Sequence, residues 1–300
     1  MPHEKIHHPR IVLITGIILI VITLLAGATV FIVMSRHAEE LLSKSLQSTL
    51  QSRVHLTQAE IRAGFDRTMI VATRPLMIDI MQRVSVGVDD GVARMAVNKV
   101  AQSFLTGFTG IALFDKDGRE VARAGSFTQK SALTVPLNVP GRVQLMWDGQ
   151  LLLHVVVDIQ QAGRVMGKVM TETLLPTTTG ALKGARSLGE TGELRLCAPL
   201  GLNKQCFPST FSPRVETLSR RGPDGNLVPM AYALAGASGF IATRDYRNHE
   251  VVAAYAPVGD LGLGMSELGS ILWRGKLMIL YQLVRRFHEV YTSSFIYRRV

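Results

Sequence analysis

An uncharged and strongly apolar segment near the start of the chain limits most sharply what this protein can fold into. Residues 11–34 read IVLITGIILIVITLLAGATVFIVM and contain no charged residue and no proline. A helix needs about 20 apolar residues to cross the roughly 30 Å hydrocarbon core of a bilayer, so this segment is long enough to span one. The run is longer than the apolar part of a signal peptide and continues past Ala26-Gly27-Ala28, which resembles a cleavage site. The sequence therefore predicts a retained membrane anchor, in preference to a cleaved signal peptide or a buried helix of a soluble domain.

The flanking charges do not decide the orientation of this anchor. Lys5 and Arg10 precede the segment, and Arg36 and Lys44 follow it, so both ends carry positive charge. The short basic tail, residues 1–10, is easily left in the cytoplasm, and we therefore expect the large remainder to be exported. The whole chain carries 33 Lys and Arg against 23 Asp and Glu. This excess alone is a weak indicator of nucleic-acid binding, and we predict the lipid bilayer as a partner and no nucleic acid.

A long helix is predicted to continue directly from the anchor. Residues 35–74 contain no proline and a single glycine, Gly64. Their apolar residues recur mainly at helical spacing, which places them on one face directed toward a core. The residues of this predicted face are Ala38, Leu42, Leu46, Leu50, Val54, Ile61, Phe65 and Met69.

The rest of the chain alternates short β-type runs with turn signals. Residues 108–114 and 119–123 flank an Asp-Gly turn at 115–118, and residues 142–147 and 151–157 flank a second one. A further strand is predicted at residues 163–171. A similar second pass then follows: a helix at 174–188, a strand at 193–197, a helix-like segment at 213–221, and a hairpin of residues 238–245 and 250–257 with its turn at 246–249. This order of elements predicts an α+β fold.

Two segments of this second pass resemble a known family. Residues 243–265, TRDYRNHEVVAAYAPVGDLGLGM, are similar to the closing hairpin of bacterial double Cache sensor domains, and residues 188–194, LGETGEL, are similar to the start of the membrane-proximal sheet in that family. The resemblance covers about residues 35–265. It implies a transmembrane helix that continues into a long helix, followed by two PAS-like modules of five-stranded antiparallel sheet with flanking helices. The implied boundaries are a cytoplasmic tail 1–10, a transmembrane helix 11–34, a membrane-distal module 35–172, a membrane-proximal module 173–265 and a tail 266–300.

The resemblance also implies a function. Double Cache domains lie outside the cytoplasmic membrane, bind a small molecule and control a histidine kinase, a diguanylate cyclase or phosphodiesterase, or a chemotaxis module. This chain has no motif of such an output enzyme. We therefore expect a single-pass protein of the bacterial inner membrane with a periplasmic or extracellular sensor domain, which forms a homodimer through the long helix and has no catalytic residue and no cofactor. The alternatives are a membrane-anchored exported enzyme and an assembly protein of the envelope.

The C-terminal tail, residues 266–300, departs from the family pattern. It is rich in basic and aromatic residues, and its apolar run 271–284 is interrupted by Arg274 and Lys276. Such a run is a poor bilayer span. Two interpretations are open: an amphipathic helix at the membrane surface, or an end left by truncation or a change of reading frame.

Candidate site residues follow from their position on predicted strands and from the compartment. Ligands of the distal module are predicted at Arg123, Trp147, His154 and Asp158, and the cations among them suit an anionic ligand. Cys197 and Cys206, the only cysteines, bracket a short loop and are predicted to form a disulfide in an exported domain; the alternative is two buried thiols. No metal is predicted, because two cysteines without a nearby histidine are too few ligands and the Asp115 loop lacks those of a calcium site.

Overall fold

The computed structural model describes residues 8–85, 91–184, 192–222, 225–244 and 250–270 of the chain. The chain divides into two compact units, residues 1–46 and 47–300. The first unit consists, in its described part, of the N-terminal portion of helix α1, which extends over His8–Thr73. Within it, Ile14–Met34 is a stretch of 21 residues that is long and apolar enough to cross a membrane. The predicted apolar helix and the long helix after it are therefore confirmed as one element.

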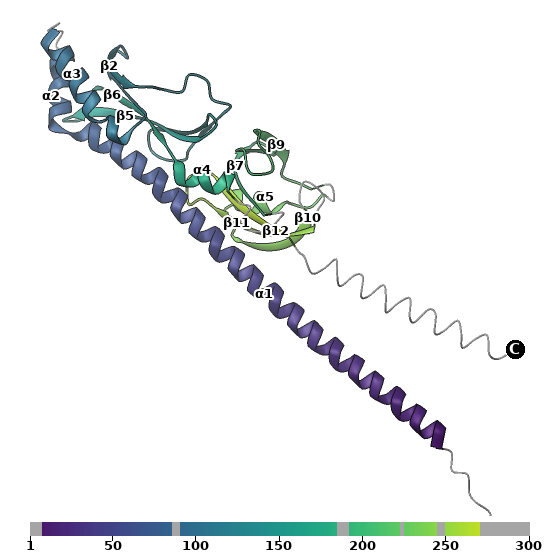
Figure 1. Ribbon diagram of the computed structural model, residues 1–300. Helices are drawn as coiled ribbons and strands as arrows, with labels where there is room; N and C mark the ends of the chain where they lie inside the picture. The colour runs from purple at the N-terminus through teal and green to yellow at the C-terminus, as the bar shows by residue number, and fades with distance from the viewer. Residues whose placement is uncertain (1–7, 86–90, 185–191, 223–224, 245–249, 271–300) are drawn as a thin grey trace, which may run out of the picture. The chain divides into compact units, whose positions relative to one another are not determined.

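The second unit contains two antiparallel sheets of six strands each (Figure 1). The order is β2-β1-β6-β5-β4-β3 in the first, here called sheet A, and β10-β11-β12-β7-β8-β9 in the second, sheet B. Sheet A consists of β1 (Gly110–Asp115), β2 (Glu120–Gly125), β3 (Leu133–Pro136), β4 (Arg142–Trp147), β5 (Leu151–Gln161) and β6 (Arg164–Leu174). Sheet B consists of β7 (Glu193–Leu200), β8 (Asn203–Cys206), β9 (Glu216–Ser219), β10 (Gly239–Arg244), β11 (Glu250–Pro257) and β12 (Gly264–Ser270).

The predicted α+β class with two antiparallel sheets is thus confirmed, but the expected five strands per sheet are wrong. Each sheet ends in a strand of four residues, β3 in sheet A and β9 in sheet B. In both sheets the first strand in chain order pairs with the last one in the interior of the sheet, not at an edge. The first and the last strand of the chain segment that forms each sheet are therefore neighbours.

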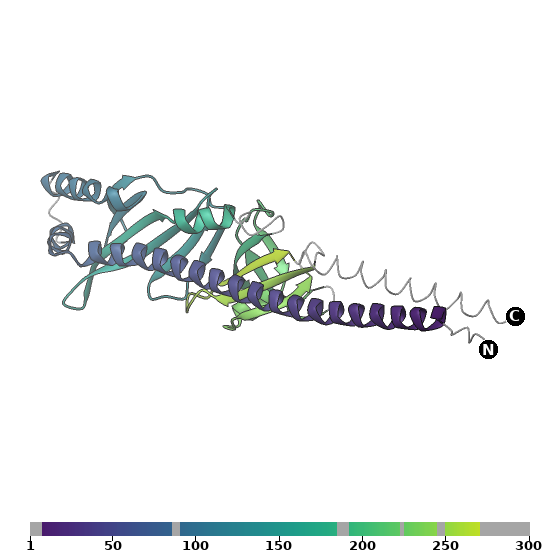
Figure 2. The same cartoon turned by 60° about the horizontal axis from the view of Figure 1, so that its bottom comes forward.

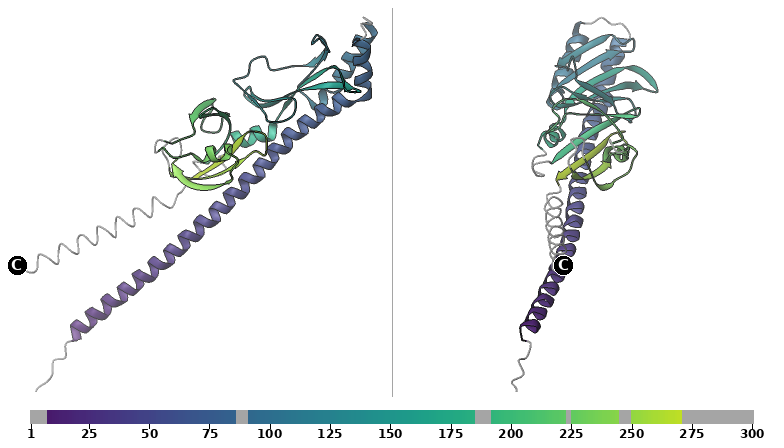
Figure 3. Two further views of the ribbon diagram at one scale, coloured as in Figure 1. Left: turned by 180° about the vertical axis from the view of Figure 1, so that it is seen from behind. Right: turned by 90° about the vertical axis from the view of Figure 1, so that its right-hand side faces the viewer.

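Short helices complete the second unit. They are α2 (Pro75–Ser85), α3 (Gly91–Ser103), the 3-10 turn η1 (Leu105–Gly107), α4 (Pro176–Lys183) and α5 (Pro229–Leu234). Residues 47–73 of α1 run along both sheets: in Figure 2 this part of the helix passes in front of them, and in the left view of Figure 3 both sheets lie on one side of it. The helix thus provides one shared wall for the two sheets.

The buried stripe of this helical segment differs from the predicted one. The buried positions follow each other at spacings of four and three residues: Leu50, Val54, Thr57, Ile61, Gly64, Thr68 and Val71. Phe65 is only half-buried and Met69 is 37% exposed, so their predicted core positions are wrong. The prediction counted apolar residues alone, whereas small and hydroxyl-bearing residues let the helix approach the sheet. Thr68 Oγ1, for example, is hydrogen bonded to Thr171 Oγ1 of β6 at 2.7 Å.

The hairpins predicted from Asp-Gly turns are present. In the turn between β1 and β2, one carboxylate oxygen of Asp115 accepts the backbone N–H of Asp117 at 2.9 Å and that of Arg119 at 2.8 Å. The carboxylate therefore stabilises the turn itself. The second Asp-Gly pair joins β4 to β5, as predicted.

Two segments of the second pass are corrected by the structure. The helix predicted at residues 213–221 is wrong, because Glu216–Ser219 forms β9 and pairs with β8 at the edge of sheet B. Residues 264–270 form β12, which lies between β11 and β7, so the sheet extends beyond residue 265. The predicted turn 246–249 and the tail from residue 271 lie outside the described residues.

Candidate functional site

Three of the four predicted ligand residues share one face of sheet A. Residues that lie opposite each other in an antiparallel pair point to the same face of the sheet. His154 lies opposite Glu172, and Asp158 lies opposite Lys168. Arg123 lies opposite Ala112, which in turn lies opposite Met170 of β6. This polar face is turned away from α1, since α1 contacts the opposite face through Thr171.

Trp147 lies on the face that is directed toward α1 and is separated from the other three residues. It is opposite Leu151 in the pairing of β4 with β5, and its side chain is buried. Its ring centroid is 6.5 Å from that of Phe207, which precedes β9 in the sheet B segment, and Lys183 Nζ lies 5.7 Å from the ring. Trp147 therefore packs in the core where the two sheet segments meet.

A buried carboxylate organises the middle of the polar face. Glu172 is 2% exposed and accepts hydrogen bonds from the backbone N–H of Thr128 at 3.0 Å and from its hydroxyl at 3.0 Å. These bonds hold the segment after β2 over the sheet. Burial lowers the pKa of the neighbouring His154, and the charge of Glu172 opposes this shift only in part. His154 is thus kept neutral at pH 7 and can both donate and accept a hydrogen bond.

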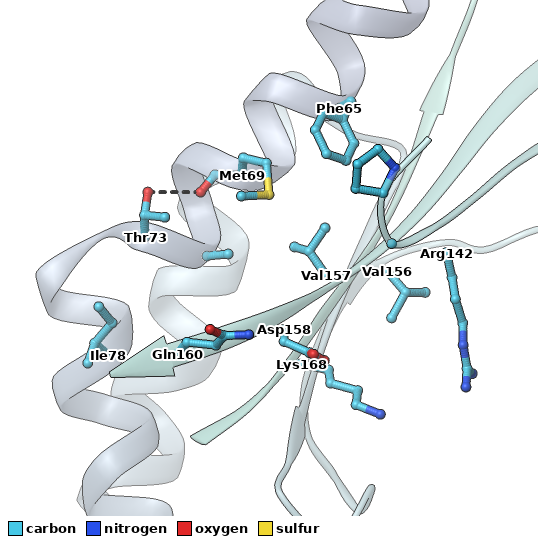
Figure 4. A pocket seen from close by; sticks show the side chains of 13 residues that line it. Phe65, Met69, Thr73, Ile78, Arg142, Val156, Val157, Asp158, Gln160 and Lys168 are labelled. Carbon is cyan, nitrogen blue, oxygen red and sulfur yellow. Dashed lines mark hydrogen bonds between the residues drawn. The ribbon is translucent and has the colours of Figure 1, made fainter. Parts of the chain in front are cut away.

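A pocket of about 510 Å³ lies between α1, α2 and the edge of sheet A (Figure 4). Phe65 and Met69 line its helix side and face Val157 of β5. Its lining residues are Phe65, Met69, Ala72, Thr73, Ile78, Pro140, Gly141, Arg142, Val156, Val157, Asp158, Gln160 and Lys168. The helix wall is thus apolar. Arg142, Asp158 and Lys168 line the pocket from the face of the sheet that is turned away from α1, around the part of β5 that extends beyond β4. Such a pocket can hold a small molecule that has both a charged and an apolar part.

The structure brings one of the predicted ligand residues, Asp158, into this pocket, where it lies beside Lys168 (Figure 4). Arg123 lies elsewhere on the sheet: it forms an ion pair with Glu120 at 2.6 Å, and its guanidinium lies 4.8 Å from the ring centroid of Phe127. Sequence reasoning missed Arg142, Lys168 and Glu172. A signal for Glu172 existed, since it is the only acidic residue of β6.

The predicted disulfide is present in sheet B. Cys197 of β7 and Cys206 of β8 lie directly opposite each other, with a Cα–Cα distance of 4.0 Å and an S–S bond of 2.06 Å. Both are buried and pack against Met230 and Ala233 of α5. Within the described ranges no group of three or more His, Cys, Asp or Glu side chains is placed to hold a metal ion.

Comparison of this chain with known proteins finds similar solved structures but no matching family model or curated protein. The ligand-binding domain of a Campylobacter jejuni chemoreceptor in complex with L-valine has a TM-score of 0.47 at 10% identity, with 79% of this chain and 95% of that chain covered. The ligand-binding domain of a Pseudomonas fluorescens chemoreceptor in complex with L-isoleucine has a TM-score of 0.46 at 10% identity, with 79% and 96% covered.

A third similar structure is the ligand-binding domain of a Pseudomonas aeruginosa PAO1 amino acid chemoreceptor in complex with GABA. Its TM-score is 0.47 at 12% identity, with 75% of this chain and 99% of that chain covered. All three are ligand-binding domains of bacterial chemoreceptors. L-valine, L-isoleucine and GABA are the ligands of those three proteins.

Proposed function

We propose that this protein is a membrane-anchored extracytoplasmic sensor, which binds a small molecule in the pocket between α1 and sheet A. Ile14–Met34 holds the chain in the bacterial inner membrane in a single pass, and both sheets lie on the outer side. The observation that carries the proposal is the composition of the pocket, because α1 supplies one wall and sheet A the other. A ligand there touches the same helix that contains the apolar anchor.

The proposed mechanism is a ligand-dependent bias on the position of α1 relative to sheet A. A ligand that contacts both walls favours the arrangement in which it binds best, and the bias equals its difference in affinity between the two arrangements. No bond has to be made or broken in the ligand, and we propose no catalytic activity. The small molecule and a second copy of this chain are the proposed partners, besides the bilayer.

The second copy is proposed to bind along the outer side of α1. Leu56, Ala63 and Ile70 are exposed, and they follow each other at intervals of seven residues. An exposed apolar stripe at this spacing is typical of a helix that pairs with another helix. Paired helices can slide or tilt against each other, which gives the dimer a way to transmit the bias.

The test is a ligand screen on the full-length protein in lipid nanodiscs. A compound that binds only the native state raises the unfolding midpoint. We expect at least one small charged metabolite from a panel of amino acids, organic acids and amines to do so. Lys168→Gln should abolish this shift, whereas Lys116→Gln, at the exposed turn between β1 and β2, should leave it unchanged. A shift that survives Lys168→Gln would contradict the assigned pocket, and turnover of the compound would favour an exported enzyme.

A further inference from the structure

The second sheet carries a pocket of its own, on the face opposite to α1. It has a volume of about 240 Å³ and lies between sheet B, which forms its floor, and the start of α5. Its described lining contains four cationic side chains and no acidic one: Arg195, Lys204, Arg221 and Arg244. The remaining walls are largely apolar, with Leu218, Val228, Met230 and Leu268 among them.

Two of these cations are built into the floor of the pocket. Arg195 of β7 is 5% exposed and Lys204 of β8 is 7% exposed, although charged side chains are almost never buried without a partner. Arg195 forms an ion pair with Glu216 of β9, which compensates one of the charges. Arg195 also lies opposite Ser266 of β12, which lines the same pocket.

Of the two floor cations, Lys204 has no acidic partner among the described residues. Its Nζ donates to the backbone carbonyl oxygen of Ser219 at 2.9 Å, and this bond uses one of its three N–H groups. Burial, and to a lesser extent the nearby charges of Arg195 and Arg220, together lower the pKa of Lys204 to about 8. The groups around it are thus mostly of its own sign, and a negative charge in the pocket would replace repulsion by attraction.

We propose that sheet B holds a second ligand site, which takes a small organic carboxylate. The carboxylate accepts hydrogen bonds from Lys204 and Arg221 at the cationic end, and the apolar part of the molecule packs against Val228 and Met230. The apolar walls select a carboxylate with a short hydrocarbon part over inorganic phosphate, whose whole surface is polar. This site is separate from the sheet A pocket and does not depend on the function proposed for it.

The experiment is isothermal titration of the full-length protein in nanodiscs with acetate, butyrate, succinate and inorganic phosphate at constant ionic strength. We expect butyrate or succinate to bind and phosphate not to bind. Lys204→Gln and, separately, Arg221→Gln should weaken binding about tenfold or more, which is the usual loss for one charge-assisted hydrogen bond. Lys116→Gln, at the exposed turn between β1 and β2, is the matched control and should bind the carboxylate normally; Lys168→Gln reports separately on the sheet A pocket and should leave binding at the sheet B site unchanged.

Three results would overturn the proposal. They are the absence of heat with all carboxylates, binding that neither pocket variant weakens, and binding of phosphate without binding of any carboxylate. Arg221 is exposed, so Arg221→Gln keeps the test valid if the buried Lys204→Gln does not fold. Because Lys168→Gln removes only the sheet A pocket, failure of one site is distinguishable from failure of the other.

Discussion

At the scale of single residues, the ion pair between Glu267 and Arg53 leaves a buried carboxylate poorly satisfied. Glu267 lies on β12 with its side chain fully buried, and neither carboxylate oxygen has a hydrogen-bond partner. Its Oε2 is 3.5 Å from Arg53 Nε on α1. Burial raises the pKa of Glu267 to about 7, and the charge of Arg53 opposes this rise without cancelling it. The desolvation of the carboxylate thus outweighs its attraction to the arginine.

This pair predicts that the protein becomes less stable as the pH rises from about 4.5 to about 7. In this window the folded state keeps the Glu267 proton, whereas the unfolded chain has lost it, since its pKa there is the ordinary 4.5. The folded state therefore binds more protons, and the free energy of unfolding falls as the pH rises. Glu267→Gln should flatten this dependence and make the protein more stable than wild type at pH 8. Urea unfolding at pH 5, 6, 7 and 8 measures it.

Glu120→Gln is the control for this experiment. The hydrogen bond from Arg123 lowers the pKa of Glu120 below 4.5, so Glu120 affects the stability only at pH values below the window. The Glu120→Gln variant should therefore keep the wild-type slope between pH 4.5 and 7. A Glu267→Gln protein that kept the wild-type slope would show that another group causes the dependence.

At the scale of elements, the packing of α1 on the sheets depends on residues that a count of apolar positions overlooks. The sequence predicted the helix because proline is absent and apolar residues recur, and it predicted the hairpins because Asp-Gly pairs favour tight turns. The buried face of the helix was placed less well, since Thr57, Gly64 and Thr68 are buried by contact with partners far along the chain. Only the three-dimensional partner, such as Thr171, explains why a hydroxyl faces the core.

Gly64→Ala should therefore destabilise the protein, although alanine favours a helix. A Cβ at position 64 would lie 2.6 Å from Leu153 Cδ2, and Leu153 is fully buried. Overpacking of a core costs about 1–3 kcal/mol, which exceeds the roughly 1 kcal/mol that alanine gains over glycine in a helix. Gly180→Ala in α4 is the matched control, because no atom lies within 4 Å of its new Cβ. Urea unfolding should show a loss for the first and a small gain for the second; a gain for both would contradict the close packing.

The exposed stripe of α1 leads to a prediction about the dimer. Leu56→Glu places a charge in the proposed helix interface, where a buried leucine contributes about 1.5–3 kcal/mol. We expect the dissociation constant of the dimer to rise about tenfold or more, measured by single-molecule photobleaching in nanodiscs over a range of protein-to-lipid ratios. Gln51→Glu, an exposed position off the stripe, should not change it. Equal association of both variants would exclude this face as the interface.

At the scale of the whole molecule, the fold class was within reach of the sequence and the sites were not. Turn chemistry and apolar spacing are local, so they gave two sheet-forming passes after a long helix. The pockets instead depend on register: Asp158 meets Lys168 only because β5 pairs with β6 in one particular alignment. Likewise Arg195 and Arg244 line one pocket although they are 49 positions apart in the sequence. A single sequence does not specify which strands are neighbours.

The redox state of the disulfide indicates in which compartment the protein lies. Cys197 and Cys206 form a bond that persists in oxidising compartments and is rare in the cytoplasm. If Ile14–Met34 exports the rest of the chain, alkylation of intact cells followed by a gel shift should find both thiols blocked until a reductant is added. A double Leu19→Arg and Leu24→Arg substitution costs about 2.5–3.5 kcal/mol per arginine at the centre of a span. The double variant should therefore stay in the cytoplasm with both thiols free.

Met95→Arg is the control, because this exposed side chain lies far from the span in sequence and should leave both export and the disulfide intact. Free thiols in the wild-type protein of intact cells would contradict the exported orientation, whatever the state of the variants. A disulfide that still formed in the double variant would separate bond formation from the apolar segment. Since the bond joins two neighbouring strands of sheet B, its presence reports the compartment of the same sheet that holds the proposed carboxylate site. If the disulfide is found in intact cells, the proposed ligand of that site is a carboxylate available outside the cytoplasm.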